Sequence, residues 1–298
     1  MASPTKGLRI AFFGTPQFAV DILNELATAH ITPTVVVASP DAPRGRGLVL
    51  TPPETKTWAE AHEIPVLQPE TLRLKGNDPD RDILYNSEWD LFIVASYGKI
   101  LPQSLLDIPK HGTLNVHPSL LPQYRGASPV RTAILEDNPD AVGVSIMLLD
   151  AGMDSGPIVA QGRITLERES GDWPVRAPML EQLLAHEGGQ LLAEILPEWL
   201  AGSVTPEPQD HTAATFSEKI DKHMGLLDLS ADPWKNYLTF CALDGAVGTY
   251  FFIEKDARQM RVKITDASFC DNAFVVERVI PEGKKEMSYA DFKRSYES

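Results

Sequence analysis

The sequence predicts an α/β fold: a mostly parallel sheet with helices on both faces, followed by a smaller β-rich C-terminal domain. Apolar runs typical of buried strands at 8–13, 34–39 and 90–95 alternate with helical patterns. After Trp199 the composition changes to Gly, Ser and Pro, and short alternating runs follow. A chain of 298 residues is also long for one core, so we expect two domains.

The first strand covers 8–13 and ends at Gly14. Thr15 and Pro16 then offer a helix N-cap and a first helical position, so a helix should follow to about Ala29. This strand–turn–helix order suits a Rossmann-like sheet, but the turn does not match G-x-G-x-x-G. We therefore do not expect a nicotinamide enzyme.

The rest of the first domain continues the alternation of strands and helices. We expect further strands at 34–39, 90–95, 114–117 and 142–149, and helices around 58–62, 80–85, 129–135 and 179–200. Strands separated by helices form parallel sheets that are covered on both faces. This order predicts a three-layer first domain.

The domain boundary is expected where the composition changes. We assign 1–200 to the catalytic domain, 201–212 to a linker rich in Gly, Ser and Pro, and 213–298 to the second domain. The short runs 248–254, 260–264 and 273–279 predict a small antiparallel β unit there.

Charge and cysteine content narrow the class of protein. The net charge of −14 disfavours general binding to DNA, RNA or anionic lipid, so any contact with nucleic acid would need a local basic patch. Cys241 and Cys270 are too few for a disulfide framework and lack metal-ligand spacing, so we expect no metal. With no secretory leader and no long apolar segment, we expect a cytoplasmic protein that contacts no membrane. We also expect a monomer.

Three side chains could carry out chemistry together. Asn115 and His117 are two residues apart at a strand end, and strand geometry turns both to one face. Asp154 lies in Gly-Met-Asp-Ser-Gly, where glycines permit a tight turn that exposes a carboxylate. An amide N–H stabilises an oxyanion, an imidazole moves protons, and a carboxylate orients the imidazole. The set suits attack of an amine on a carbonyl carbon.

Each residue also has a structural interpretation when taken alone. Asn115 could be a turn-forming strand end, His117 a hydrogen-bonded structural histidine, and Asp154 a turn residue. Only the longer sequence segments around these residues can distinguish a catalytic role from a structural one.

Those segments resemble the 10-formyltetrahydrofolate-dependent formyltransferases. The resemblance covers nearly all of residues 7–200 and is carried by the following segments: Phe13-Gly14-Thr15-Pro16, Ser96-Tyr97-Gly98-Lys99-Ile100-Leu101-Pro102, Asn115-Val116-His117-Pro118-Ser119-Leu120-Leu121-Pro122, Tyr124-Arg125-Gly126-Ala127 and Asp150 to Gly156.

The resemblance implies a role for each matching position. It makes Asn115, His117 and Asp154 the catalytic triad and 10-formyltetrahydrofolate the formyl donor. It also implies folate-binding positions at Ser119, Leu120, Leu121, Pro122, Tyr97, Gly98 and Ile100.

Within this family the chain is most similar to members that formylate methionyl initiator tRNA, which add a C-terminal OB-like barrel for the tRNA. The segment 40–47 resembles their acceptor-stem loop and implies tRNA contacts by Arg44 and Arg46; 283–292 resembles their closing motif. Leu48 and Val49 stand where that loop usually continues with lysines, and Ala242-Leu243-Asp244-Gly245-Ala246 where Pro-Trp-Pro-Gly is expected.

The charge of the second domain keeps other functions open. From residue 207 onward the sequence has 12 lysines and arginines and 16 aspartates and glutamates, so this part carries a net negative charge. An RNA partner favours positive charge. The alternatives are an amino-sugar N-formyltransferase acting on a nucleotide sugar, a formyltetrahydrofolate hydrolase, and a folate- or RNA-binding module without catalysis.

Overall fold

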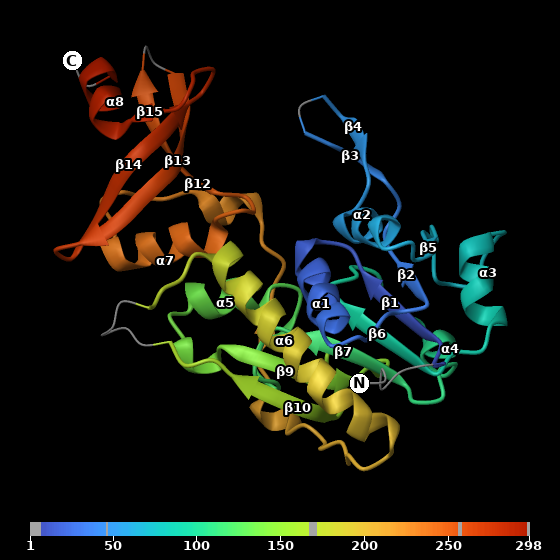
Figure 1. Ribbon diagram of the computed structural model, residues 1–298. Helices are drawn as coiled ribbons and strands as arrows, with labels where there is room; N and C mark the ends of the chain where they lie inside the picture. Colours follow the sequence, from blue (N-terminus) through green and yellow to red (C-terminus); the bar gives the residue numbers. More distant parts are fainter. Residues whose placement is uncertain (1–6, 46, 167–171, 256–257, 297–298) are drawn as a thin grey trace. The chain divides into compact units, whose positions relative to one another are not determined.

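The computed structural model describes residues 7–45, 47–166, 172–255 and 258–296, and its contacts divide the chain into two compact units (Figure 1). The first unit holds the chain up to Arg125 together with Gly143–Ile164 and Glu181–Thr215. The second holds Gly126–Val142, Thr165–Leu180 and the chain from Phe216 onward. The predicted domain and linker boundaries along the sequence stay a prediction.

The first unit is built on a seven-stranded sheet in the order β10-β9-β7-β6-β1-β2-β5. Its strands are β1 (Ile10–Gly14), β2 (Val35–Val37), β5 (Val66–Leu67), β6 (Leu91–Ala95), β7 (Thr113–His117), β9 (Gly143–Leu148) and β10 (Ile158–Arg163). The five strands from β7 to β5 are parallel, whereas β9 and β10 run antiparallel to their neighbours. The predicted mostly parallel sheet with helices on both faces is confirmed.

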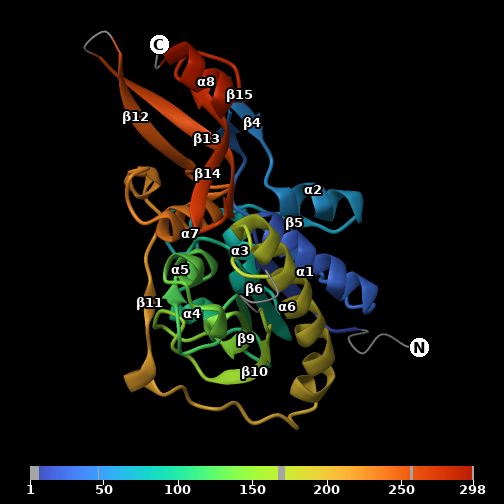
Figure 2. The ribbon, with the colours of Figure 1, turned by 90° about the vertical axis from the view of Figure 1, so that its left-hand side faces the viewer.

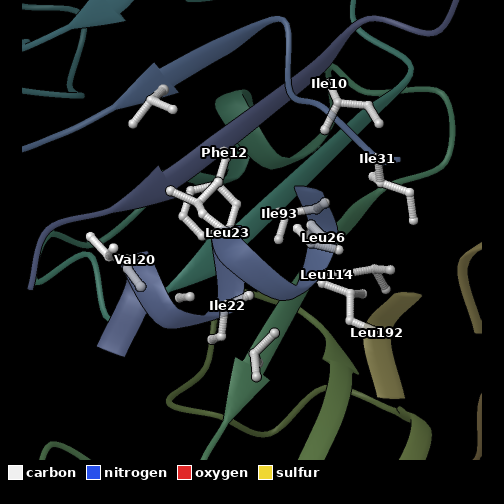
Figure 3. Packing of buried hydrophobic residues seen from close by; sticks show 14 of the residues in the cluster. Ile10, Phe12, Val20, Ile22, Leu23, Leu26, Ile31, Ile93, Leu114 and Leu192 are labelled. Atoms are coloured by element: carbon white, nitrogen blue, oxygen red, sulfur yellow. The ribbon is translucent and has the colours of Figure 1, made fainter. Parts of the chain in front are cut away.

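One face of this sheet is covered by α1 (Gln17–Thr28), α2 (Glu54–Ala61) and the long helix α6 (Ala177–Leu200). Along α1 the buried positions Ala19, Ile22, Leu23 and Leu26 recur every three or four residues, which gives the helix one apolar stripe. Figure 3 shows this stripe on Ile10, Phe12 and Ile93 of the strands, with Leu192 of α6 close by. Each leucine, isoleucine or phenylalanine in this cluster contributes about 1.5–3 kcal/mol on burial.

The opposite face is covered by α3 (Pro79–Asn86) and α4 (Gln103–Leu106). Phe13 and Phe92 pack there edge to face, with ring centroids 5.1 Å apart. Helix α3 begins where Asp78 accepts a hydrogen bond from the Arg81 N–H. The expected N-cap Thr15 does not cap α1, because its hydroxyl donates to the Tyr97 carbonyl at 3.2 Å and Pro16 occupies the cap position.

Helix α6 lies close to the sheet because it carries glycine where it crosses the strands. A Cβ on Gly188 would lie 2.7 Å from Val116 and 2.9 Å from Val144. The apolar side chains of β7 and β9 fill this space instead.

The second unit contains a four-stranded antiparallel sheet in the order β12-β13-β14-β15 (Figure 2). Its strands are β12 (Thr249–Lys255), β13 (Arg258–Cys270), β14 (Ala273–Pro281) and β15 (Met287–Ser288), and its helices are α5 (Pro129–Leu135), α7 (Pro233–Leu243) and α8 (Tyr289–Tyr296). The predicted antiparallel β unit is confirmed.

Several short elements complete the chain. They are β3 (Ala42–Arg44), β4 (Val49–Thr51), β8 (Arg125–Gly126), β11 (Phe216–Ser217) and the 3-10 helices η1 (Pro139–Ala141), η2 (His211–Ala213) and η3 (Lys222–Gly225). Across the described residues, no helix has the length and hydropathy that crossing a membrane requires.

Candidate active site

The end of β7 carries two of the three predicted catalytic side chains. Leu114 and Val116 belong to the core beneath α6, so the alternation of the strand turns Asn115 and His117 to the other face. Asn115 is 8% exposed and His117 4%. Within the described part of the chain the Asn115 amide has no side-chain hydrogen-bond partner, so its N–H groups are available to a bound molecule.

His117 is held in one tautomer by a main-chain carbonyl. Its Nε2 lies 3.0 Å from the carbonyl oxygen of Tyr124. A carbonyl oxygen only accepts, which assigns the hydrogen to Nε2 and leaves the lone pair of the neutral ring on Nδ1. Nδ1 is therefore the atom of His117 that can take up a proton.

Asp154 faces that atom. Its Oδ2 lies 3.8 Å from His117 Nδ1. This separation is too long for a hydrogen bond, but a protonated imidazole and a carboxylate at this distance attract each other. Asp154 is thus placed to stabilise the imidazolium that proton uptake creates.

Asp154 reaches His117 through a loop that folds back over the sheet. Because β9 runs antiparallel to β7, Ser145 pairs with His117 and Leu148 pairs with Leu114. The chain therefore leaves β9 beside Leu114, near the start of β7, and residues 149–157 lead it back toward His117 at the other end of that strand. Two positions in this loop fix its path: Asp154 has a φ of +46°, and a Cβ on Gly156 would lie 1.9 Å from the Leu148 carbonyl oxygen.

A buried hydroxyl on β9 supports the loop that follows His117. Ser145 Oγ donates to the Ser119 carbonyl at 2.6 Å and accepts from the Leu121 N–H at 3.0 Å and from Gln161 Nε2 at 2.8 Å. Gln161 also donates to the Leu121 carbonyl. These bonds tie residues 119–121 to β9 and β10.

The predicted folate-binding positions of this loop differ in exposure. Ser119 and Leu121 are buried, and the Ser119 hydroxyl donates to the Gln123 carbonyl at 2.6 Å. Leu120 and Pro122 are half-buried. Any contact from Ser119 or Leu121 would therefore come mainly from the main chain, while Leu120 and Pro122 can present their side chains.

The second predicted folate segment follows β6. The Tyr97 side chain points into the core against Phe13, with ring centroids 5.5 Å apart, and burial raises the pKa of its phenol. Lys99 fixes the segment by donating to the Pro69 carbonyl at 2.7 Å. Gly98 and Ile100 are exposed, so these two positions can meet a ligand.

The predicted tRNA-contacting loop is a hairpin of β3 and β4. Arg44 is exposed and donates from both terminal guanidinium nitrogens to the Glu54 carboxylate, which lowers the pKa of that carboxyl. Leu48 and Val49 are also exposed, at 73% and 66%. The other predicted contact, Arg46, lies outside the described residues.

The supporting residues Ser145 and Gln161 could not be identified from the sequence. Ser145 stands in an apolar strand and Gln161 in an ordinary edge strand, and neither has a local signature. Among the described residues, no group of three or more His, Cys, Asp or Glu could hold a metal ion.

Comparison with known proteins identifies a family and relatives that this chain resembles in sequence. Residues 8–176 match the formyl transferase family. A methionyl-tRNA formyltransferase of Chloroflexus aggregans is 43% identical over 246 residues, covering 78% of this chain and 76% of that protein. A methionyl-tRNA formyltransferase of Bacillus licheniformis is 35% identical over 315 residues, covering 96% of this chain and 94% of that protein.

A solved structure shares the fold. The sugar N-formyltransferase of a Shewanella species superimposes with a TM-score of 0.61 at 16% identity, covering 85% of this chain and 95% of that one. At this identity the likeness concerns the fold and not the acceptor.

Proposed function

The chain belongs to the formyl transferase family, and from this membership we propose that it transfers the formyl group of 10-formyltetrahydrofolate to the α-amino group of methionyl initiator tRNA. The product is N-formylmethionyl-tRNA for translation initiation. One observation carries the proposal: Asp154 comes from a different segment from Asn115 and His117 of β7, yet its carboxylate lies 3.8 Å from His117 Nδ1. The Bacillus relative adds support because its match extends into the second unit.

Asn115 supplies the oxyanion donor in this proposal. When the amine nitrogen bonds to the formyl carbon, negative charge develops on the formyl oxygen. The Asn115 amide has no competing partner among the described side chains, so its N–H can bind that oxygen. The buried position of the amide strengthens this interaction, since water screens it less.

His117 carries the proton. The attacking amine must lose one proton as the new C–N bond forms, and the leaving folate nitrogen must gain one as the old C–N bond breaks. Nδ1 accepts the first proton, and Asp154 stabilises the ring while it is charged. The same proton can then pass to the leaving nitrogen, so that the site returns to its starting state.

The hairpin of β3 and β4 is the proposed contact with the tRNA. Arg44 presents two donors that now bind the Glu54 carboxylate, and a phosphate has the geometry to replace that carboxylate. Arg46 is proposed as its neighbour in this contact on sequence grounds alone. Exposed Leu48 and Val49 add an apolar surface that lysines would not offer.

The acceptor is tested by offering 10-formyltetrahydrofolate with methionyl initiator tRNA and, separately, with amino-sugar nucleotides. Formyl transfer to the tRNA supports the proposal. Transfer only to a sugar would show that the acceptor is an amino-sugar nucleotide and not the tRNA. Release of folate without any acceptor would indicate a hydrolase. An Asp154→Asn protein serves as the control for background hydrolysis.

The hairpin contact has its own control. Arg44→Gln should raise KM for tRNA and leave KM for the folate unchanged, because only the phosphate contact is lost. Glu54→Gln releases Arg44 from its partner and should not raise KM for tRNA. An equal KM in the wild type and Arg44→Gln would exclude Arg44 from the contact.

A further inference from the structure

One buried amide holds the turn that presents Asp154. Gln209, which is 6% exposed, donates from Nε2 to the Asp154 carbonyl at 3.0 Å and to the Gly156 carbonyl at 2.6 Å. It follows α6 in the segment 201–215, which runs beside β10 through paired bonds between Ile158 and Glu207 (Figures 1 and 2). This segment is therefore anchored next to the Asp154 loop.

The orientation of the Gln209 amide is fixed by a buried arginine. Arg125 donates to Gln209 Oε1 from Nε at 3.0 Å and from Nη2 at 2.6 Å. A guanidinium has no acceptor, so Oε1 must face Arg125 and the NH₂ group must face the turn. Both donors and both acceptor sites of the amide are thus used.

The same segment supports the other partner of His117. The Tyr124 N–H donates to Thr215 Oγ1 at 2.9 Å, the Arg125 N–H donates to the Thr215 carbonyl at 2.9 Å, and the Thr215 N–H donates to the Pro122 carbonyl at 3.2 Å. The Tyr124 carbonyl sets the tautomer of His117. Both groups that flank the imidazole are therefore tied to residues 209–215.

We propose that Gln209 is a positioning residue for catalysis, which holds the Asp154 turn so that its carboxylate faces His117 Nδ1. The proposal rests on the proposed function. Asp154 sits at a φ of +46°, which is uncommon for a non-glycine residue although aspartate adopts it more readily than most, so contacts that hold this turn help to fix where the carboxylate lies. Gln209 binds the carbonyl of Asp154 itself and that of Gly156, two residues further on. Such positioning affects the rate, because a displacement of about 1 Å at a reacting group can lower turnover about 100-fold.

The test variant is Gln209→Glu. A carboxylate still pairs with Arg125, so the buried guanidinium keeps a partner, but its second oxygen now faces the carbonyls of Asp154 and Gly156 and cannot donate. We expect kcat for formyl transfer to fall on the order of 100-fold. KM for both substrates should stay within about twofold, because ground-state binding does not depend on this turn.

The control is Gln190→Glu, which makes the same chemical change at an exposed position of α6. It should keep wild-type kcat. A fall in kcat in both variants would attribute the effect to charge and overturn the proposal.

A double-mutant cycle separates positioning from a general structural effect. If Gln209 acts through Asp154, adding Gln209→Glu to an Asp154→Asn protein should lower kcat no further. Independent effects would multiply, and that result, or full activity of Gln209→Glu alone, would overturn the proposal. If Gln209→Glu does not fold, the same cycle with Gln209→Asn, whose shorter side chain cannot span from Arg125 to the turn, is judged by the same criteria.

The cycle is independent of the acceptor. It is run with whichever acceptor the wild type formylates, so a wrong acceptor would overturn the proposed function while leaving the role of Gln209 to be decided by the cycle.

Discussion

Replacing Asn115 by alanine separates catalysis from folding at one buried position. The amide has no side-chain partner among the described residues, so its removal breaks no hydrogen bond of the folded chain. We expect the free energy of unfolding to change by no more than about 1 kcal/mol. Loss of an oxyanion donor, by contrast, should raise the activation barrier by about 3 kcal/mol, which lowers kcat roughly 100- to 1000-fold.

The same strand offers a matched control. Thr113 lies two residues before Asn115 on the same face, is 2% exposed, and its Oγ1 has no hydrogen-bond partner in the described chain. Thr113→Val keeps the shape and removes a buried polar group, so activity should stay at the wild-type level and stability should rise by about 1 kcal/mol.

The assay is formyl transfer to methionyl initiator tRNA at saturating folate, alongside thermal unfolding of each variant. Wild-type turnover in Asn115→Ala, within about tenfold, would remove Asn115 from the mechanism. A large loss of stability in that variant would instead show that the amide has a structural partner.

Three further predictions follow from the described contacts. Asp154→Asn should lower kcat roughly 1000-fold in the transfer assay, because it removes a charge that stabilises the His117 imidazolium by roughly 4 kcal/mol at an effective dielectric constant of about 20; a loss below tenfold would contradict the pairing at 3.8 Å. Gly188→Ala should destabilise the first unit by about 1–3 kcal/mol in chemical denaturation, because the added methyl meets Val116 and Val144; equal stability would show that α6 can move away at little cost. Asp90 accepts a hydrogen bond from the Arg9 N–H at 2.7 Å, which holds the pKa of its carboxyl below the ordinary value, with a smaller effect from Lys110. A carboxyl whose pKa is lower in the folded than in the unfolded state stabilises the fold at a pH above the unfolded pKa of about 3.9, and this stabilisation is lost as the pH falls through the folded pKa. Asp90→Asn should therefore lower the unfolding temperature at pH 7 but not at a pH below the folded pKa. A difference in unfolding temperature that does not depend on pH would contradict this.

Much of the fold follows from local patterns. The strands β1 and β6 are visible in the sequence as continuous apolar runs, because both of their faces are buried. The stripe of α1 is visible because burial on one face repeats with the period of a helix. The hairpin of β3 and β4 was expected only as a loop. Its residues are exposed and include Pro43, so no burial pattern marks it as strand.

The sequence by itself determined that Asn115 and His117 share a face, because alternation along a strand is a local property. Only the tertiary structure decided that Asp154 joins them. The strand before Asp154 runs antiparallel to β7, and neither strand direction nor the path of a returning loop is encoded within a few residues.

The same holds for Gln209. Its neighbours in sequence predict an ordinary linker, yet its amide meets Arg125, 84 residues away, and the Asp154 turn, 55 residues away. Contacts across such separations are set by the order of the strands in the sheet and by the segments that cover it. The chemical roles at the site could therefore be predicted from its residue types, whereas the way these residues come together depends on the whole first unit.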